Sequence, residues 1–266
     1  MKTIKLVVSD IDGTLIRRGE EFPQAVKDVV RELGKRGIGF TFASGRLPYM
    51  ITPYMKEMEL NVPVCACNGT LLYQGDTVLE RHPMKIWRLR PLLEKSLNLD
   101  MTVLYAANGV EYCLAENEAV RRKARERGYY HEIRPLSEEE WDTLDVDKVN
   151  ILDEKKGTPH LAPMEQELQG FCDITHYGDQ GLEIVAAGYG KEYGLTRLAE
   201  MMGVPLDQVL AIGDNENDNA MLRIAGIGGV VGNGTPDTKA CGDIVAEAEA
   251  GEGTAEIIRR VCLQEE

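Results

Sequence analysis

Two aspartates separated by one residue, Asp10 and Asp12, stand directly after an apolar segment and before Gly13. An acid pair in a turn is commonly solvated or caps a helix. Here the preceding residues 4–8 are continuously apolar, which favours a buried strand. Gly13 permits the positive φ or close backbone approach that a sharp turn requires. We therefore expect both acids at a strand end, where side chains from several parallel strands converge on one site.

Two further segments carry groups that suit an anion. Ser44, Gly45 and Arg46 follow the apolar residues 38–43 and precede a helical segment, which places a hydroxyl and amides as anion donors at a helix N-terminus. A simple N-cap is the alternative. Lys191 stands at the start of another helical segment, where the helix dipole disfavours a cation. Its position indicates a nearby anion, with an ordinary surface lysine as the alternative.

A second acidic segment runs from Asp214 to Asp218 and includes Asn217. It follows the apolar strand 209–212 and opens another helical segment. The run of acid and amide side chains after Asp214 is longer than helix capping requires. We expect these side chains at the same sheet edge as the first acid pair.

These groups together solve one electrostatic problem. A phosphate monoester carries nearly two negative charges, and two unit charges about 4 Å apart repel by roughly 4 kcal/mol at an effective dielectric constant of about 20. A divalent cation offsets the repulsion between the phosphate and the carboxylates. Oxygen ligands suit Mg²⁺, which would be held by Asp10, a backbone carbonyl near Asp12, and Asp214. Lys191 and Ser44 would hold the remaining phosphoryl oxygens.

The elements that position these residues alternate in the first and last thirds of the chain. Continuously apolar strands are typical of parallel sheets covered on both faces. The expected strands are 4–8, 38–43, 62–66, 209–212 and 227–231, and the expected helices are 23–35, 48–59, 195–202, 219–225 and 255–262. This pattern predicts an α/β fold with a doubly wound, mostly parallel, Rossmann-like sheet.

The middle of the chain, residues 83–187, has a different order of expected helices and strands and is predicted to be an inserted α+β domain. Residues 1–82 and 188–266 then form the catalytic core. Asn108-Gly109 is the dipeptide of a type I′ hairpin turn. The other expected elements are the helices 86–97, 116–127 and 159–168 and the strands 149–152, 171–176 and 182–185.

Composition excludes several classes of protein. The chain has 30 basic and 44 acidic residues, a net charge of −14 and 43% hydrophobic residues, as in ordinary globular proteins. Such a charge repels nucleic acids and anionic membranes, and we expect neither as a partner. The apolar residues 6–8 are too few for a signal segment, and no stretch approaches a membrane span. Six cysteines without a CxxC pair are typical of a reducing cytoplasm.

Four motifs resemble, in order and spacing, those of the haloacid dehalogenase-like hydrolase superfamily. They are Asp10-Ile11-Asp12-Gly13-Thr14-Leu15, Ser44-Gly45-Arg46, Lys191, and Gly213-Asp214 through Asn217-Asp218. The insertion between the second and third motifs resembles the C2 cap of the Cof-type subfamily, subclass IIB. Asn68-Gly69 and residues 232–253 also resemble Cof-type segments, so the resemblance covers essentially the whole chain.

The resemblance implies a Mg²⁺-dependent phosphoric monoester hydrolase that works through an aspartyl-phosphate. It makes Asp10 the nucleophile and Asp12 the general acid and then base, with the backbone carbonyl of Asp12 and the side chain of Asp214 as metal ligands. Ser44 and Lys191 would bind the transferring phosphoryl group. The other implied site residues are Gly45, Arg46, Asn68 and Asn217, which would contact phosphate or substrate, and Asp218, which would support the metal site without binding the ion.

The same residues are compatible with two other functions. A phosphomutase of the same superfamily would share the nucleophile and acid/base pair but return the phosphoryl group to its substrate. A regulator that binds a phosphorylated metabolite without catalysis is disfavoured, because all the implied catalytic residues are present. The glycine-rich residues 226–234 lack the GxGxxG spacing of a dinucleotide site. No Walker lysine motif indicates ATP-driven chemistry.

The insertion is placed to act as a lid that selects the leaving group. Ordinary packing is the simpler interpretation of the polar and aromatic residues near its strand ends, which are Tyr105, Tyr112, His176, Tyr177 and Glu183. The resemblance implies as substrate a small phosphorylated metabolite, either a sugar phosphate or a phosphorylated cofactor or precursor.

Overall fold

The computed structural model describes residues 3–17, 21–128, 130–153, 160–168, 170–176, 178 and 180–264. The chain divides into two compact units, which we call the core unit (Met1–Glu80 with Tyr189–Glu266) and the inserted unit (Arg81–Gly188). All six cysteines are free thiols. Within the described ranges, no helix is long and apolar enough to cross a bilayer.

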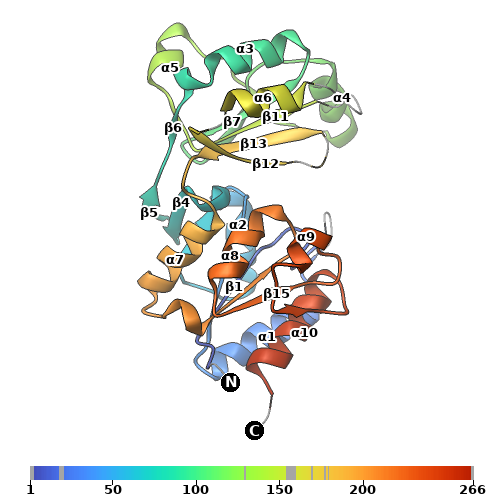
Figure 1. Ribbon diagram of the computed structural model, residues 1–266. Coiled ribbons are helices and arrows are strands. Elements are labelled where there is room, and N and C mark those ends of the chain that lie inside the picture. The colour runs from blue at the N-terminus through green and yellow to red at the C-terminus, as the bar shows by residue number, and fades with distance from the viewer. Residues whose placement is uncertain are drawn as a thin grey trace. The chain divides into compact units, whose positions relative to one another are not determined.

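A five-stranded sheet forms the centre of the core unit (Figure 1). In spatial order its strands are β16 (Ile244–Val245), β15 (Ile227–Val230), β14 (Val209–Gly213), β1 (Leu6–Ser9) and β2 (Gly39–Phe42). All neighbouring strands run parallel. The strands β1 and β14 are buried along their whole length, as expected for a parallel sheet with both faces covered. The predicted α/β fold class with a parallel sheet is confirmed.

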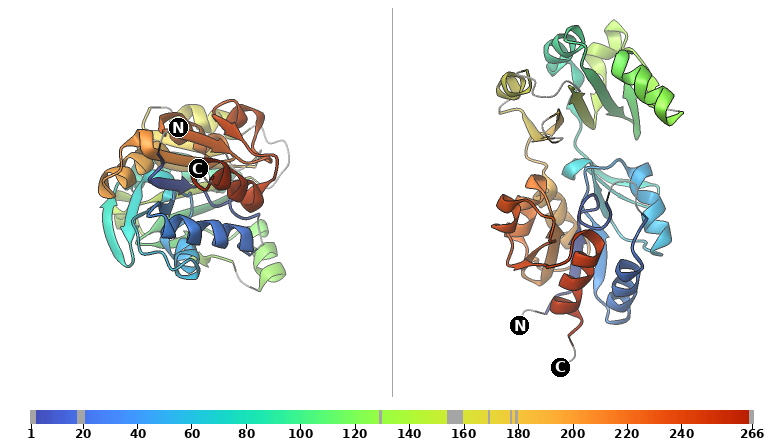
Figure 2. Two further views of the ribbon diagram at one scale, coloured as in Figure 1. Left: turned by 90° about the horizontal axis from the view of Figure 1, so that it is seen from below. Right: turned by 90° about the vertical axis from the view of Figure 1, so that its right-hand side faces the viewer.

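Helices cover both faces of this sheet. They are α1 (Gln24–Lys35), α2 (Pro48–Glu57), α7 (Lys191–Met201), α8 (Asn219–Ile224), α9 (Pro236–Lys239) and α10 (Ala250–Cys262). Leu195 of α7 packs with Leu6 and Val8 of β1 on one face. Helices α1 and α10 lie side by side (Figures 1 and 2), and Ile257 of α10 lies over Gly229 of β15. By register Gly229 belongs to the opposite face from Leu6, so the core is doubly wound.

A smaller sheet departs from the sequence prediction. It contains β3 (Val64–Ala66), β4 (Leu71–Gln74) and β5 (Thr77–Arg81). Residues 62–66 were predicted to be another parallel strand of the main sheet. Among the described pairings β3 meets that sheet in one parallel bridge, between Ala43 and Cys65, and its main partner is β4, with which it pairs antiparallel. The chain turns back at residues 67–69, all of which have positive φ.

The inserted unit contains a six-stranded sheet of order β12-β13-β11-β7-β8-β9 (Figure 1). The strands are β7 (Thr102–Ala107), β8 (Val110–Cys113), β9 (Glu132–Ile133), β11 (Lys148–Leu152), β12 (Cys172–His176) and β13 (Gly181–Ala186). Neighbours run antiparallel except β8 and β9. The β7–β8 hairpin turns at Asn108 (φ 53°) and Gly109 (φ 79°), which confirms the predicted turn.

The remaining elements of the inserted unit are β6 (Met84–Lys85), β10 (Asp145–Val146), α3 (Arg90–Asn98), α4 (Glu118–Arg127), α5 (Glu138–Thr143) and α6 (Leu161–Leu168). Helices α3 and α6 share one apolar cluster with Val149 and Ile184 of the sheet. Helix α5 was not predicted because only Trp141 is buried in it, so its sequence has no apolar period. Residue 159 of the predicted helix 159–168 and the candidate contact Tyr177 lie outside the described residues.

Candidate active site

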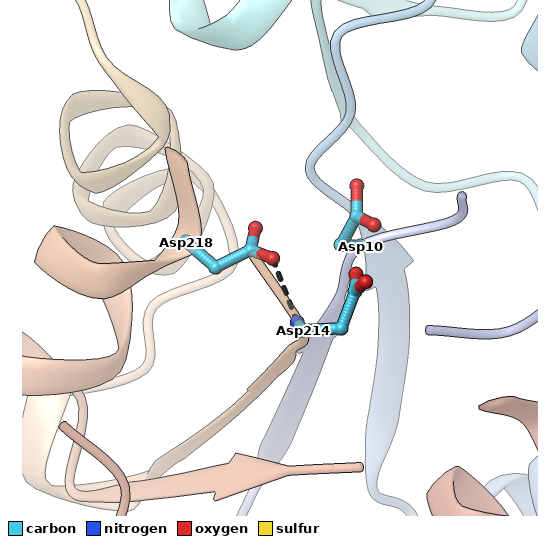
Figure 3. A group of neighbouring side chains, drawn as sticks. All are labelled: Asp10, Asp214 and Asp218. Carbon is cyan, nitrogen blue, oxygen red and sulfur yellow. Dashed lines mark hydrogen bonds between the residues drawn. The ribbon is translucent and has the colours of Figure 1, made fainter. Parts of the chain in front are cut away.

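Asp10 and Asp214 follow adjacent parallel strands at one edge of the core sheet. β1 pairs with β14 with Ser9 opposite Ile212, so the residues that follow each strand emerge together. Asp218 lies in the 3-10 turn Glu216–Asp218 that precedes α8. Figure 3 shows the side chains of Asp10, Asp214 and Asp218 grouped at this edge. One carboxylate oxygen from each lies within 4.8 Å of the others. The sheet topology therefore brings together acids that are some two hundred residues apart in the sequence.

Lys191, the first residue of α7, is buried beside these acids. Its Nζ donates hydrogen bonds to Asp10 Oδ1 and to Asp218 Oδ1, each at 2.7 Å. Lys191 is 1% exposed, which excludes an ordinary surface lysine. The nearby negative charge that its position predicts comes from the two aspartates Asp10 and Asp218.

Asp218 fixes the turn that carries Asp214. While Oδ1 of Asp218 accepts from Lys191, Oδ2 accepts from the backbone N–H groups of Asp214 (2.9 Å) and Asn215 (3.1 Å). Thr14 Oγ1 donates to Asp214 Oδ1 at 2.8 Å. Because the oxygens of Asp218 already serve these donors, the carboxylates of Asp10 and Asp214 are better suited to hold a cation.

Gly13 is required for the close approach of Asp214. Its φ is +86°, and a Cβ built at Gly13 would lie 2.3 Å from Asp214 Oδ2. The predicted reason for this glycine is confirmed. The carbonyl of Gly13 accepts from Asn233 Nδ2 at 2.9 Å, and Asn233 Oδ1 accepts from Ala250 N at 2.7 Å. Sequence reasoning gave Asn233 no role, although its place in the family-like segment 232–253 was a signal.

The acidic cluster carries excess negative charge. Asp10, Asp214 and Asp218 supply three carboxylates and Lys191 one ammonium, so 1 − 3 = −2 remains when all are ionised. Burial raises the pKa of Asp10 to about 8, against the opposing effect of Lys191 and with reinforcement from Asp218 and Asp214. Burial also raises the pKa of Asp214 to about 6, with Asp218 adding to the effect. Burial lowers the pKa of Lys191, but the carboxylates of Asp10 and Asp218 outweigh this effect and raise the pKa above its usual value.

A hard divalent cation fits this donor set. The oxygens are carboxylate oxygens at a buried sheet edge, and the excess of two negative charges is the charge that such an ion neutralises. Asp10 and Asp214 are the two predicted metal ligands that the structure brings together. The backbone carbonyl of Asp12 stays a predicted ligand.

Asp12 forms a separate pair with Arg46. The guanidinium donates from Nε to Asp12 Oδ2 and from Nη2 to Asp12 Oδ1, both at 2.7 Å, which is the bidentate geometry of strong arginine–carboxylate pairs. Arg46 Nη1 also donates to Tyr54 Oη at 2.8 Å. The Asp12 side chain is 53% exposed. The contact of Arg46 with phosphate stays a prediction, and the structure shows its pairing with Asp12 and Tyr54. No local sequence signal indicated Tyr54.

Ser44 follows β2 and is buried at the same edge of the core sheet. Its N–H donates to Cys65 O and its carbonyl accepts from Asn68 N, both at 3.0 Å. Its Oγ accepts from Arg46 N at 3.2 Å. Helix α2 begins at Pro48 after Leu47, so the alternative that Ser44 caps this helix is wrong, and its hydroxyl stands apart from the helix N-terminus.

Asn68 and Gly69 lie in the turn between β3 and β4 and contact the loop of Asn217 and the loop before Lys191. Asn217 Nδ2 donates to Asn68 Oδ1 at 3.0 Å. Gly69 has φ +116°, and a Cβ there would lie 2.2 Å from Gly190 O and 2.3 Å from Tyr189 O. The turn therefore packs, backbone to backbone, on the two residues that precede Lys191.

This fold and this arrangement of acids and lysine define the class of the chain. The sequence profile of the haloacid dehalogenase-like hydrolases matches residues 7–258, and the chain belongs to that family. It is a member of the Cof type, as its motifs predicted. The prediction of an enzyme, a phosphoric monoester hydrolase of this superfamily, is confirmed at the level of the family.

Similar proteins extend along the whole chain. The pyridoxal phosphate phosphatase YbhA of Escherichia coli is 26% identical, over 96% of this chain and 98% of its own. The 5-amino-6-(5-phospho-D-ribitylamino)uracil phosphatase YcsE of Bacillus subtilis is 25% identical, over 98% and 96%. A solved structure of a subclass IIB sugar phosphatase has the same fold, with a TM-score of 0.80 and 19% identity over 96% of this chain and 98% of its own.

We expect Asp214→Asn to stabilise the metal-free protein near neutral pH. The pKa of this carboxyl is raised from 3.8 to about 6 in the fold, so its ionised form opposes folding above that pH. Melting in chelator should show a gain of about 2 kcal/mol at about pH 8, which disappears below about pH 4, where the wild-type carboxyl is protonated in both states. Asp237→Asn, at an exposed position of α9, is the control. A variant less stable than wild type at about pH 8 would contradict this prediction.

We expect Gly69→Ala to destabilise the protein and to disturb Lys191. The new Cβ would collide with two backbone carbonyls, so the loop before α7 must move. A loss of about 2 kcal/mol or more in the free energy of unfolding is the expected scale for such strain. Gly75→Ala is a matched control, since Gly75 also has positive φ (57°) but nothing lies within 4 Å of its Cβ position. Equal destabilisation by both substitutions would contradict the role of the contact.

Proposed function

We propose that the protein is a Mg²⁺-dependent phosphatase that hydrolyses a small phosphorylated metabolite through an aspartyl-phosphate on Asp10. One observation carries the proposal. The buried carboxylate of Asp10 is held by the ammonium of Lys191 at 2.7 Å and lies beside Asp214 at the carboxyl edge of a parallel sheet. A carboxylate in this setting is an oriented nucleophile whose charge is partly neutralised.

In the first step, an Asp10 carboxylate oxygen forms a bond to phosphorus as the bond from phosphorus to the leaving-group oxygen breaks. Asp12 donates its proton to that leaving oxygen, and an alcohol departs. Arg46 donates to both oxygens of the ionised Asp12. When Asp12 carries the proton, the oxygen without it would keep its hydrogen bond to Arg46 and so hold the carboxyl in place. Lys191 and Ser44 would contact the phosphoryl oxygens, and Asn217, Asn68 and Gly45 would line the phosphate position.

In the second step, water attacks phosphorus and Asp12 takes its proton. The bond from phosphorus to the Asp10 oxygen breaks, which releases inorganic phosphate and restores the carboxylate. Asp10, Asp214 and the backbone carbonyl of Asp12 would hold Mg²⁺, which when bound supplies positive charge against the repulsion between phosphate and carboxylates. Asp218 holds the turn of Asp214 and the ammonium of Lys191 in place.

The names of two relatives support the substrate class. Pyridoxal phosphate and a phosphorylated ribitylamino-uracil are both small phosphate monoesters. The substrate is accordingly a sugar phosphate or a phosphorylated cofactor or precursor, and the inserted unit is the cap that selects the leaving group. A cytoplasmic location, and the lack of nucleic-acid and membrane partners, stay predictions from the sequence.

We expect Asp10→Asn to abolish phosphate release. The amide is a poor nucleophile, so turnover should fall at least about a thousandfold. The measurement is a phosphate-release screen across phosphorylated metabolites, with Mg²⁺ and with chelator, in the absence of a bisphosphate activator. Asp237→Asn should turn over like wild type. Equal turnover by Asp10→Asn would overturn the nucleophile, and release that requires a bisphosphate would favour a phosphomutase.

We expect Asp12→Asn and Arg46→Lys to impair the release of poor leaving groups selectively. An alkyl alkoxide needs the proton of Asp12, whereas nitrophenolate leaves without it. The ratio of kcat/KM for an alkyl phosphate to that for nitrophenyl phosphate should fall roughly a hundredfold in Asp12→Asn and roughly tenfold in Arg46→Lys, which cannot keep the bidentate pair. An unchanged ratio in both variants would contradict the acid role of Asp12.

A further inference from the structure

Asn233 links the loop that follows β1 to the start of α10. Its Nδ2 donates to the carbonyl of Gly13, and its Oδ1 accepts from the N–H of Ala250. Ala250 has a φ of +46°, in the left-handed region that is unfavourable for a residue with a Cβ. Such strain persists where the surrounding structure holds it, and it is concentrated at functional sites. Asn233 is itself exposed, so its side chain acts here through these two hydrogen bonds and not through core packing.

The N-terminal part of α10 contacts the next two carbonyls of the same loop. Thr254 is fully buried, and its Oγ1 donates to the carbonyl of Thr14 at 2.7 Å. A Cβ built at Gly251 would lie 2.5 Å from the carbonyl oxygen of Leu15, so α10 approaches the loop as closely as a glycine allows. The carbonyls of residues 13–15 are therefore contacted, one after another, from residues 233–254. We call Asn233, Gly251 and Thr254 the loop brace.

The loop held in this way carries groups of the proposed metal site. The N–H of Gly13 donates to the carbonyl of Ile16 at 2.8 Å. A trans peptide group is planar, with its N–H and carbonyl pointing in opposite directions, so this bond also sets the direction of the Asp12 carbonyl. Thr14 Oγ1 donates to Asp214 Oδ1 at 2.8 Å. The position of Thr14 therefore sets the orientation of a carboxylate that is suited to hold the cation.

Both groups depend on the loop brace for their orientation. Without the hydrogen bonds from Asn233 and Thr254, the two peptide groups that follow Gly13 and Thr14 lose the donors that fix their carbonyls. Glycine opposes backbone rotation less than any other residue, so the loop would then be free to turn at Gly13. Such a rotation would turn the Asp12 carbonyl and displace the hydroxyl of Thr14. Mg²⁺ demands near-ideal octahedral geometry from its oxygen ligands, so its affinity is sensitive to displacements of this kind.

We propose that Asn233 and Thr254 are positioning residues for the Mg²⁺ site and act on it through the loop after β1. Their side chains contact the backbone of that loop and are not ligands of the ion. The inference rests on the Mg²⁺ site of the function proposed above. It goes beyond that function because it makes the affinity for Mg²⁺ depend on α10, which contains none of the proposed ligands.

The test measures the dissociation constant of Mg²⁺ from thermal melting of the full chain, without substrate, across a series of Mg²⁺ concentrations. In Asn233→Ala this constant should rise about tenfold, the lower end of the effect of groups that orient metal ligands. Thr254→Val keeps the shape of the side chain without its hydroxyl and should cause a similar rise. Thr254→Ser keeps the hydroxyl and should bind Mg²⁺ like wild type.

Two matched controls change the same residue types at exposed positions outside the loop brace. Asn98→Ala in α3 and Thr77→Val in β5 should keep the wild-type dissociation constant of Mg²⁺. Melting in chelator gives the stability of each metal-free variant. A merely structural role would lower that stability and leave the dissociation constant unchanged.

The possible outcomes separate the inference from the proposed function. An unchanged dissociation constant in Asn233→Ala and Thr254→Val, or an equal rise in Thr254→Ser and Thr254→Val, would overturn the inference and leave the Mg²⁺ site intact. If Asn233→Ala does not fold, the comparison of the two Thr254 variants decides. A wild type that binds no Mg²⁺ would overturn the proposed metal dependence and the inference with it.

Discussion

The excess of buried carboxylates around a single ammonium is the constraint on which the core unit depends. Three aspartates meet Lys191 at the edge of the sheet, and Lys191 can satisfy only part of their charge. Metal-free folding therefore works against electrostatic repulsion, and burial makes that repulsion stronger. Such local conflicts are typical of functional sites, because the same charges become favourable when a cation and a substrate are present.

The parallel topology is what makes this concentration of charge attainable. β1 and β14 are adjacent strands of the sheet and run in the same direction. The acid that follows each strand therefore lies at the same edge of the sheet. Backbone contacts then fix the side chains, as when Asp218 accepts from the N–H groups of Asp214 and Asn215. Because the acids are held by strands and by a hydrogen-bonded turn, the geometry does not rely on a flexible loop.

The sequence predicted the parts of the site that follow from local pattern. Asp10 and Asp214 come directly after continuously apolar strands, and Lys191 opens a helix, so each position has a local physical reason. The pairing of Asp12 with Arg46 and Tyr54 depends on distances between loops, which spacing does not encode. Glu183 was named as a candidate in the inserted unit but its partner Lys148 was not, because cross-strand register decides which side chains share a face.

The elements of the fold were likewise predicted where they follow from local pattern and missed where they do not. Strands of the main sheet were predicted because their apolarity is continuous. The strand β3 meets that sheet in one parallel bridge, as its direction predicted, but the left-handed turn at residues 67–69 sends the chain back to pair with β4. Helix α5 rests on a capping box between Ser137 and Glu140 rather than on an apolar face. Short elements of this kind are stabilised by their ends, and periodicity does not detect them.

The contact of Gly69 with Tyr189 and Gly190 has a mechanical consequence. The chain leaves the inserted unit at residue 188, and Lys191 follows only three residues later. Residues 189 and 190 are packed against the turn of Gly69, so the backbone just before α7 is held from outside the helix. The position of the ammonium beside Asp10 therefore depends on a turn more than a hundred residues earlier in the chain as well as on its own helix.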